Sequence, residues 1–221
     1  MIDDTLERLA KLDSCAVSDA LDRLGLKGCV TGLEPLSSSR RISGRVHTVK
    51  LVEKDKASQQ PGAPRHLGCA AIEACEAGEV IVVEQRTGID CGSWGGILSL
   101  GAKLRGVAGV IADGPVRDLD EARQMHFPVF GRSGTARTAR GRIGEEATDV
   151  PVTIGDVAVH PGDYVLADAS AVVFVAAAEI ERVLEAAQTI ASREAAMADA
   201  LRAGKPISEV MGADYEHMLK K

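Results

Sequence analysis

Apolar and polar positions in the N-terminal part of the chain follow the spacing of short helices. Residues 5–12 and 18–24 repeat apolar positions every three or four residues, which predicts two helices. Ser18 and Asp19 lie in the first turn expected for the second helix, and Gly25 follows its end. We expect these two helices to form an N-terminal cap on the rest of the fold.

The central part of the chain alternates strand-like and helix-like segments. Residues 45–53 predict a strand, residues 54–64 an exposed loop, and residues 66–75 a helix. The segment 79–84 contains a continuous β-branched run, which is typical of a strand covered on both faces. The next segments, in order, are a helix at 94–105, a strand at 107–112, a helix at 118–125 and a strand at 128–130. Such alternation indicates an α/β architecture with a largely parallel sheet.

The C-terminal half changes to short strands followed by one long helix. Turn residues separate four strands of an expected β-meander, at 152–154, 157–159, 164–167 and 172–175. From 179 to 201 a long helix carries one apolar stripe, made of Ile180, Val183, Leu184, Ala187, Ile190, Met197 and Leu201. Glu194 lies on the same stripe. Its carboxylate either reaches water at the edge of the stripe or points into the active site of a neighbouring subunit, and both interpretations stay open.

Composition and charge narrow the functional classes. The chain has 221 residues, of which 45% are hydrophobic and 26% charged, and this suits one compact domain over residues 1–221. A net charge of −6 and a pI near 5.4 argue against direct nucleic-acid binding. The five cysteines form no C-x-x-C pair and are odd in number, which fits cysteines that stay reduced rather than a set of disulfides. With neither a secretory leader nor a long apolar run in the sequence, we expect a cytoplasmic protein without a membrane partner.

A glycine-rich turn, Gly92-Ser93-Trp94-Gly95-Gly96, opens the apolar helix expected at 94–105. The first N–H groups of a helix lack intrahelical partners and lie at its positive dipole end, which suits anion binding. The amides concerned are those of Gly95, Gly96, Ile97 and Leu98. A glycine pair before a helix serves packing or a tight turn about as often. The next strand returns the chain to the same sheet edge, so we expect Gly96 near Arg117.

The segment 113–118, expected as a loop, ends in the adjacent pair Arg117 and Asp118. A local surface ion pair is one interpretation, and such pairs contribute little to stability. Gly and Pro in the same segment fix its path, which favours a preorganised site with a cation and a metal-binding carboxylate. Two more acids, Asp120 and Glu121, follow within one turn. Carboxylate ligands favour Mg²⁺ or Mn²⁺ over Zn²⁺.

The sequence gives less support for a catalytic or ligand-binding role of the other reactive residues. Cys91 lies just before the glycine turn without a partnered histidine, which is more typical of a packing cysteine than of a nucleophile. The histidines are scattered, which favours surface or structural roles; they are His47, His66, His126, His160 and His217. The arginine-rich stretch 132–142 is either a loop near the site entrance or a solvated one, and its position after the 128–130 strand favours the first.

Motifs that resemble one protein family run along most of the chain. They are Val17-Ser18-Asp19-Ala20-Leu21-Asp22-Arg23-Leu24-Gly25, Trp94-Gly95-Gly96-Ile97-Leu98, Gly106-Val107-Ala108-Gly109-Val110, Asp113-Gly114-Pro115-Val116-Arg117-Asp118, Phe127-Pro128-Val129-Phe130, Pro161-Gly162-Asp163 and Ala167-Asp168. In combination they resemble the class II pyruvate aldolases that act on 4-hydroxy-4-methyl-2-oxoglutarate and 4-carboxy-4-hydroxy-2-oxoadipate, together with the related regulator of ribonuclease activity A (RraA-like). The resemblance implies a swivelling β/β/α fold, a homotrimer or a homohexamer of paired trimers, and active sites at subunit boundaries.

The resemblance also assigns roles to matching positions. It implies that Asp118 binds the divalent metal, Mg²⁺ or Mn²⁺, and that Arg117 contacts the pyruvyl oxygen of a 2-oxo acid substrate. It further implies that the backbone amides of residues 95–98 hold the substrate carboxylate.

Two positions depart from the family pattern. The well-studied form of the motif has Asp where Gly96 stands, giving D-x20-R-D. This chain resembles a second form, in which Gly is followed by R-D-x2-E-D; it matches through Glu121 but has Ala122 in place of the last Asp. The proton-transfer group therefore stays open between Glu121 and the Glu194 of a neighbouring subunit.

The function implied by the resemblance is that of a metal-dependent lyase. It would cleave 4-hydroxy-2-oxo acids to pyruvate, decarboxylate oxaloacetate, or do both, through a pyruvate enolate. Two other functions stay open: a non-catalytic protein that binds and regulates a ribonuclease, and a lyase or isomerase acting on another small carboxylic acid. Metal-dependent release of pyruvate distinguishes the enzyme from the regulator.

Overall fold

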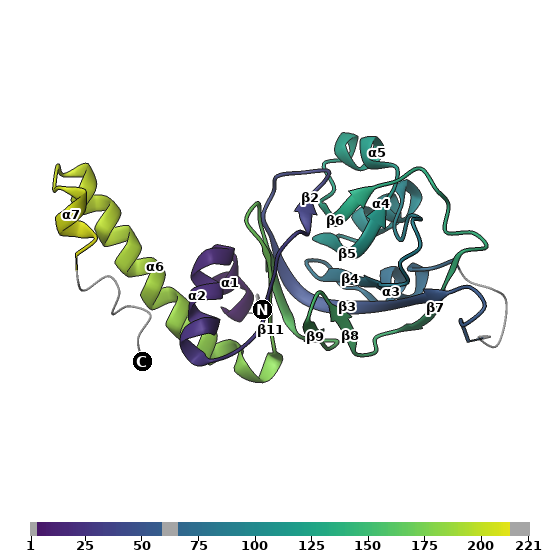
Figure 1. Ribbon diagram of the computed structural model, residues 1–221, viewed down its shortest axis with the longest axis horizontal. Coiled ribbons are helices and arrows are strands. Elements are labelled where there is room, and N and C mark those ends of the chain that lie inside the picture. The colour runs from purple at the N-terminus through teal and green to yellow at the C-terminus, as the bar shows by residue number, and fades with distance from the viewer. Residues whose placement is uncertain (1–3, 59–65, 213–221) are drawn as a thin grey trace.

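The computed structural model describes residues 4–58 and 66–212. Its centre is one large sheet with the strand order β1-β11-β10-β3-β4-β5-β6-β2, and β7 pairs with β3 off this path. Figure 1 shows the sheet at one end of the molecule and the long helix α6 leading away from it. The α/β architecture with a long C-terminal helix, predicted from the sequence, is confirmed.

Four parallel strands form the part of the sheet that carries the candidate site. They are β3 (Ile42–Glu53), β4 (Val80–Gln85), β5 (Gly109–Val116) and β6 (Val129–Gly134), paired in that order. Ile81 and Val83 of β4 belong to one hydrophobic core, whereas Val80 and Val82 belong to another core on the opposite face. Because both faces of β4 are covered, its unbroken apolar run is accommodated, as the sequence predicts.

The rest of the sheet is antiparallel. β10 (Tyr164–Ala167) pairs with the start of β3, β11 (Val172–Val175) with β10, and β1 (Cys29–Val30) with β11. β2 (Glu34–Pro35) pairs with β6, and β7 (Ile143–Thr148) with the second half of β3. β8 (Val152–Ile154) and β9 (Val157–Val159) form a separate hairpin. Apolar side chains of this hairpin share the core that contains Val80 and Val82.

Helices complete two separate cores. α3 (Cys69–Ala74), α4 (Gly96–Leu104) and α5 (Leu119–Gln124) pack on the parallel strands around Trp94 and Phe127. α1 (Asp4–Ala10), α2 (Ser14–Leu24) and α6 (Ile180–Arg202) enclose a further core, separate from the two around β4, together with β10 and β11. The 3₁₀ helix η1 (Ala177–Glu179) precedes α6, and α7 (Ile207–Val210) follows it. Among the residues described, no helix is long and apolar enough to cross a membrane.

The start of α2 differs from its prediction. The helix begins at Ser14 because Asp13 caps it, with the Asp13 carboxylate accepting a hydrogen bond from the Ala16 N–H at 2.8 Å. Asp19 therefore lies inside the helix rather than in its first turn. The predicted end is confirmed, since Gly25 has φ 69° and closes the helix in the left-handed conformation.

Three further segments differ from the sequence prediction. β5 continues to Val116 through residues 113–116, which were expected as a loop, with a register shift against β6 between Ala112 and Pro115. β7 was not predicted at all. The residues of the apolar stripe of α6 are buried only as far as Ile190, and Met197 and Leu201 at its far end are partly or largely exposed. Residues 59–64 of the predicted loop, and His217, lie outside the described residues.

Candidate functional site

The glycine turn before α4 is joined to the end of β5 by hydrogen bonds. The Ser93 N–H donates to the Pro115 carbonyl at 2.9 Å, and the Ser93 hydroxyl donates to the same carbonyl, also at 2.9 Å. The Arg117 N–H donates to the Trp94 carbonyl at 3.0 Å. Two segments more than twenty residues apart in sequence are thereby fixed side by side, and the predicted proximity of the glycine turn to Arg117 is confirmed.

Arg117 and Asp118 form the charged centre of this region. The Asp118 carboxylate accepts a hydrogen bond from the Gly96 N–H at 3.0 Å through Oδ2, and one from Arg117 Nε at 3.2 Å through Oδ1. The two side chains are 35% and 32% exposed, so the pair remains accessible from solvent. Asp118 adopts the left-handed conformation with φ 56°, which is costly for a residue with a side chain. This strained position lies at the start of α5 and directs the carboxylate toward α4.

Close packing explains the glycines of the turn. An ideal β-carbon on Gly92 would lie 2.8 Å from Cγ of Arg117, and one on Gly95 would lie 2.9 Å from Oδ2 of Asp118. Any other residue at these two positions would displace the Arg117–Asp118 pair. The absence of side chains at these glycines therefore allows the end of β5 to lie close to the start of α4, in addition to allowing the turn.

Glu121 occupies the space that a side chain on residue 96 would fill. An ideal β-carbon on Gly96 would lie 1.8 Å from Oε2 of Glu121 and 3.2 Å from the β-carbon of Asp118. Glu121 thus places a carboxylate where the well-studied form of the motif carries its additional Asp. Ala122, the other departure from the family pattern, is 1% exposed in the apolar core. A carboxylate there would be desolvated and would point away from the site.

The donors of this region fit a hard divalent cation. Asp118 and Glu121 bring two carboxylates close to the Gly96 backbone. Mg²⁺ is commonly held by one or two carboxylates while water or substrate oxygens complete its shell. The side chains that contact Gly96 are those of Asp118 and Glu121, so the local chemistry is that of oxygen ligands.

The start of α4 also offers anion-binding amides. The first hydrogen bond of the α4 ladder runs from the Ser99 N–H to the Gly95 carbonyl at 3.0 Å. The N–H groups of Ile97 and Leu98 precede it and lie at the positive end of the helix dipole. The Gly96 N–H was predicted to hold the substrate carboxylate. It donates its hydrogen bond to the Asp118 carboxylate instead.

The segment 135–142 of the arginine-rich stretch borders this region. The Thr135 N–H donates to the Val116 carbonyl at 2.8 Å, and the Gly92 N–H donates to the Arg137 carbonyl at 2.9 Å. Arg132, in contrast, lies in β6 and binds the buried Asp113 through Nε at 2.7 Å. The expectation of a loop across all of 132–142 is therefore wrong at its beginning.

Glu194 does not join the site within its own chain. It lies on the exposed second half of α6, and Figure 1 shows α6 leading away from α4 and α5. Partial burial, followed by the negative charges of Asp13 and Asp19, raises the pKa of the Glu194 carboxyl. Its electrostatic neighbours are thus acids of α2 and its N-cap.

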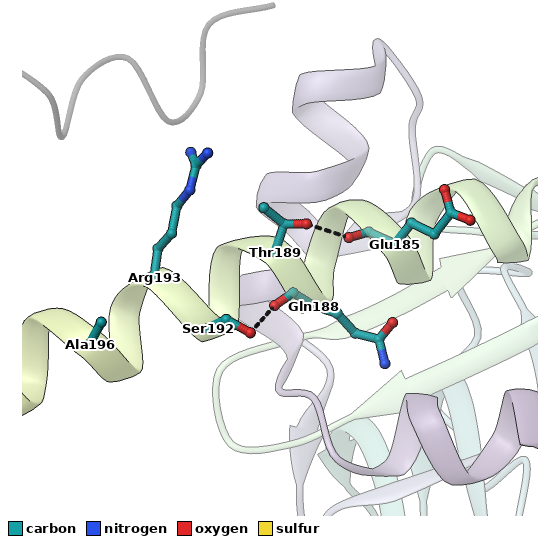
Figure 2. A pocket seen from close by; sticks show the side chains of 6 residues that line it. All are labelled: Glu185, Gln188, Thr189, Ser192, Arg193 and Ala196. Carbon is teal, nitrogen blue, oxygen red and sulfur yellow. Dashed lines mark hydrogen bonds between the residues drawn. The ribbon is translucent and has the colours of Figure 1, made fainter.

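Two surface hollows lie elsewhere. One of about 600 Å³ follows α6 and is lined by Glu185, Gln188, Thr189, Ser192, Arg193 and Ala196 (Figure 2). The hydroxyls of Thr189 and Ser192 donate to carbonyls of their own helix, so these polar groups are already satisfied. A second, of about 360 Å³, is lined by Asp13, Cys15, Ser39, Arg41, Asp168, Ala169 and Ser170. Neither hollow includes Arg117, Asp118 or Glu121.

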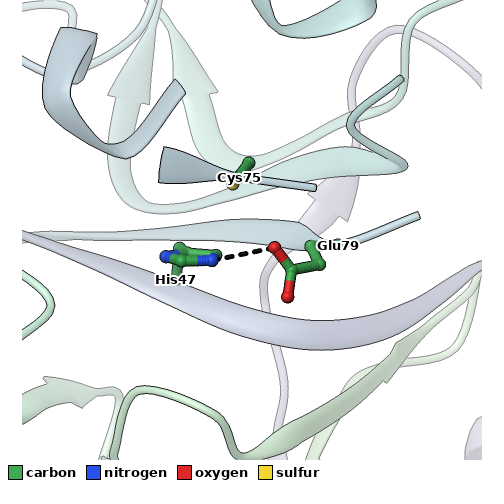
Figure 3. A group of neighbouring side chains, drawn as sticks. All are labelled: His47, Cys75 and Glu79. Atoms are coloured by element: carbon green, nitrogen blue, oxygen red, sulfur yellow. Dashed lines mark hydrogen bonds and ion pairs between the residues drawn. The ribbon is translucent and has the colours of Figure 1, made fainter. Parts of the chain in front are cut away.

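A second set of chemistry-bearing residues was missed by the sequence analysis. His47, Cys75 and Glu79 place one ligand atom each within 4.8 Å of the others (Figure 3). They come from β3, the end of α3 and the residue before β4, so no short sequence motif contains all three. Cys91, directly before the glycine turn, is buried, and burial raises the pKa of its thiol, which disfavours a nucleophilic thiolate.

Comparison with known proteins gives one family. The model of the RraA-like family, described as Aldolase/RraA, matches residues 14–174. A protein of Halalkalibacterium halodurans named "Putative 4-hydroxy-4-methyl-2-oxoglutarate aldolase" is 29% identical over 187 residues, 84% of this chain and 82% of that protein. Protein DlpA of Legionella pneumophila is 26% identical over 204 residues, which cover 92% of this chain but only 32% of its length.

Solved structures share the fold. An uncharacterized protein from Pseudomonas syringae superposes with a TM-score of 0.83 at 26% identity, covering 95% of this chain and 97% of that one. RraAS2 of Streptomyces coelicolor, described as an unusual member of the RNase ES inhibitor RraA protein family, superposes with a TM-score of 0.76 at 25% identity. That similarity covers 86% of this chain and 93% of the other.

Proposed function

Since the chain belongs to the RraA-like family, we propose that it is a divalent-metal-dependent carbon–carbon lyase. Its substrates would be 4-hydroxy-2-oxo acids of the 4-hydroxy-4-methyl-2-oxoglutarate type, cleaved to pyruvate, and oxaloacetate, decarboxylated through the same pyruvate enolate. The observation that carries the proposal is the convergence of Arg117, Asp118 and Glu121 on the glycine turn at the start of α4.

Asp118 is the residue that would hold the cation, Mg²⁺ or Mn²⁺, and Glu121 lies beside it. When bound, such an ion supplies Lewis-acid polarisation of the 2-keto group. The hydrogen bonds that Asp118 accepts from Gly96 and Arg117 fix the orientation of its carboxylate beforehand. Fixed orientation matters because a ligand that is already positioned spends little free energy on reorganisation.

Arg117 would stabilise the negative charge that develops on the 2-keto oxygen. Its Nε is bound to Asp118, which fixes the plane of the guanidinium while its terminal nitrogens can serve the substrate. Removal of one preorganised donor to an oxyanion costs about 10²–10³-fold in kcat in other enzymes. The amides of Ile97 and Leu98 would bind the substrate carboxylate at the positive end of α4.

Glu121 is the proton acceptor that we propose for aldol cleavage. Cleavage between C3 and C4 requires removal of the proton from the C4 hydroxyl, either by Glu121 Oε2 directly or through one water molecule. The position of Glu121 against Gly96 supports this role, because it fills the space of the additional Asp in the related motif. The Glu194 of a neighbouring subunit is the second candidate.

Assembly would complete the site. α4 exposes a stripe of large apolar side chains beside the charged centre, with Ile97 80%, Leu100 42% and Leu104 79% exposed. Residues three and four positions apart share one helix face, so these three form a continuous apolar strip. We propose that a second copy of the chain covers it in a homotrimer or a pair of trimers.

One experiment separates the enzyme from a non-catalytic regulator. Chelator-treated protein is supplied with Mg²⁺ or Mn²⁺ and a panel of 2-oxo acids, and pyruvate release is measured by a coupled reductase. We expect metal-dependent release that Arg117→Ala and Asp118→Ala abolish and that the exposed-surface variant Arg123→Ala retains. The similarity to the Streptomyces coelicolor protein favours the regulator as the second candidate. Absence of pyruvate from every acid, with inhibition of a purified endoribonuclease, would establish that alternative.

A further inference from the structure

His47, Cys75 and Glu79 form a compact group at the end of the parallel strands opposite the proposed lyase site. His47 of β3 lies in register with Ile81 of β4, and Glu79 directly precedes β4. Cys75 closes α3 beside them. The proposed lyase site lies beyond the carboxyl end of β5, so the length of β4, roughly 20 Å at 3.3 Å per residue, separates the two groups.

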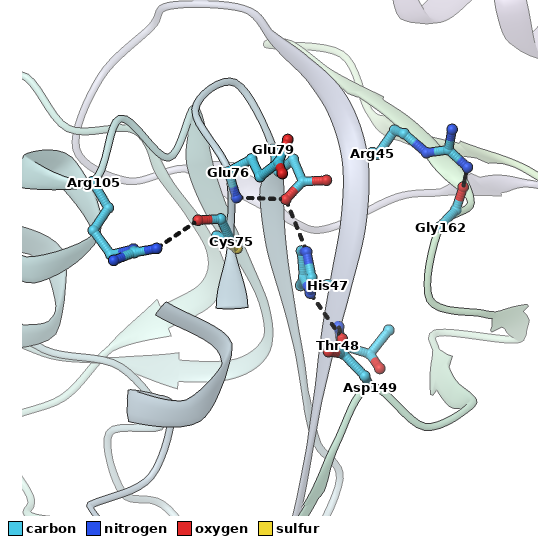
Figure 4. Close-up of polar contacts among 9 residues, drawn as sticks. All are labelled: Arg45, His47, Thr48, Cys75, Glu76, Glu79, Arg105, Asp149 and Gly162. Carbon is cyan, nitrogen blue, oxygen red and sulfur yellow. Dashed lines mark hydrogen bonds and ion pairs between the residues drawn. The ribbon is translucent and has the colours of Figure 1, made fainter. Parts of the chain in front are cut away.

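The imidazole of His47 is held from both sides. Its Nδ1 lies 2.9 Å from Oδ1 of Asp149, and its Nε2 lies 2.8 Å from Oε2 of Glu79 (Figure 4). When Nδ1 carries the proton and donates to Asp149, Nε2 becomes an acceptor that faces another acceptor. A cation or a second proton between Nε2 and Glu79 is then required. An imidazole oriented by a carboxylate on its far nitrogen is the usual arrangement around metal-binding histidines.

Glu79 and Asp149 are themselves constrained. Oε2 of Glu79 also accepts the Glu76 N–H at 2.7 Å, which holds the carboxylate toward His47. Asp149 adopts a left-handed conformation with φ 53°, and its own N–H donates to the Thr48 carbonyl at 2.9 Å. Both carboxylates are therefore fixed by the backbone rather than by flexible cations.

Cys75 contributes a buried sulfur to the group. Its side chain is 1% exposed, and Figure 3 shows the sulfur on the side facing His47 and Glu79. Burial, together with the charges of Glu79 and Asp149, raises the pKa of the thiol to about 12. Arg105 binds the main-chain carbonyl of Cys75 at 3.2 Å rather than the carboxylates. The negative charges of the group therefore lack a close guanidinium partner among the contacts shown in Figure 4.

We propose that His47, Cys75 and Glu79 bind one Zn²⁺ ion, with water as the fourth ligand and Asp149 orienting His47. Sulfur, imidazole nitrogen and carboxylate oxygen together favour Zn²⁺ over Mg²⁺. In a tetrahedron with Zn²⁺–ligand distances of ~2.0–2.3 Å, the ligand atoms lie about 3.3–3.8 Å apart. Side-chain movements of about 1 Å would bring the three ligand atoms to these separations. The side chains of His47 and Glu79 are 20% and 21% exposed, which leaves a route for the ion and for water.

The ion would balance the charge of its two anionic ligands, the Cys75 thiolate and the Glu79 carboxylate, and would join three segments of the chain. Binding would release the Cys75 proton to solvent. The end of α3 would then be fixed to β3 and β4, at a site that is independent of the proposed lyase function.

Zinc content and a cobalt spectrum test the proposal. The full-length protein is treated with chelator, dialysed against Zn²⁺ and measured by elemental analysis; we expect one Zn²⁺ per chain. Replacement of Zn²⁺ by Co²⁺ should give the thiolate-to-cobalt charge-transfer absorption that reports a Cys ligand. Cys75→Ser should abolish this absorption, whereas Cys29→Ser, a substitution of the same kind on β1, should retain it.

Further variants separate this site from the others. Asp149→Asn should keep the absorption but lower the affinity for Zn²⁺ by about 10–100-fold, as is typical of groups that orient a ligand. Asp118→Ala should leave both zinc content and absorption unchanged. If Cys75→Ser does not fold, His47→Gln gives the same comparison. Zinc below one ion per chain in the wild type, or an unchanged cobalt absorption in Cys75→Ser and His47→Gln, would overturn the proposal.

Discussion

The carboxylate of Glu121 lies against the backbone of Gly96, in the volume that a side chain on residue 96 would occupy. The separation of 1.8 Å between Oε2 and an ideal β-carbon means that the two positions cannot both carry an acidic side chain without rearrangement. A carboxylate can reach this place from α4 or from α5. In this chain it comes from α5.

The first prediction concerns an exchange of these two positions. Gly96→Asp alone should lower both the unfolding temperature and pyruvate release, because two like charges would compete for one space. The double variant Gly96→Asp with Glu121→Ala should recover most of the release that Glu121→Ala loses. We expect a coupling energy of about 0.5–3 kcal/mol from a double-mutant cycle. Gly101→Ala is the control, since a β-carbon there meets Ile72 at an ordinary 3.9 Å. Additive effects of the two substitutions would contradict the exchange.

The second prediction separates two reactions of the proposed lyase. Glu121→Gln keeps the shape of the side chain and removes its basicity, so aldol cleavage should slow by about 10²–10⁴-fold. Decarboxylation of oxaloacetate needs no base on a C4 hydroxyl and should change far less. Both rates are followed by pyruvate release at saturating Mg²⁺. Asp120→Asn, at the exposed neighbouring acid on α5, serves as the control. Equal loss of both reactions would argue against Glu121 as the proton acceptor.

The third prediction is a loss of stability in acid that depends on Asp168. Its carboxylate is partly buried, which alone raises the pKa, but hydrogen bonds from Ser14, Ser170 and Ala171 outweigh burial and lower the pKa below its usual value. A carboxyl with a lower pKa in the folded state stabilises the fold above the pKa of the unfolded chain. This contribution is lost as the pH falls through the folded-state pKa.

Asp168→Asn should therefore lower the urea midpoint at pH 7 and change it much less at the lowest pH at which the protein still folds. Ser14 donates to Asp168 through both its N–H, at 2.9 Å, and its hydroxyl, at 2.6 Å, so Ser14→Ala should show part of the same effect. A midpoint difference that is constant with pH would exclude ionisation of Asp168 as the cause.

The fourth prediction concerns Glu194. Its pKa is raised by partial burial and by Asp13 and Asp19, so its ionised form opposes folding above that pKa, and the effect disappears below the pKa of the unfolded chain. Glu194→Gln should raise the unfolding temperature slightly at pH 7 and leave it unchanged near pH 4. The rise should be small because solvent screens an exposed carboxylate. Pyruvate release of the same variant decides whether Glu194 also acts in a neighbouring subunit, since a purely electrostatic role leaves the rate unchanged.

The sequence determined those elements whose signals lie within a few residues. The unbroken apolar run within 79–84 predicted β4, and Gly25 marked the end of α2 because glycine adopts the left-handed conformation without strain. The proximity of the glycine turn to Arg117 also followed from sequence, because successive strand–helix units return to the same sheet edge.

Only the tertiary structure decided where distant residues meet. Asp113 belongs to a strand rather than a loop because it pairs with Glu84 of β4. Arg132 Nε at 2.7 Å and the Gly155 N–H at 2.8 Å satisfy its carboxylate, and neither partner is visible from local composition. The contact between Glu121 and Gly96, and the meeting of His47 with Glu79, likewise join separate elements. Local periodicity reports which face of an element is buried, but long-range pairing and packing determine which side chains share a site.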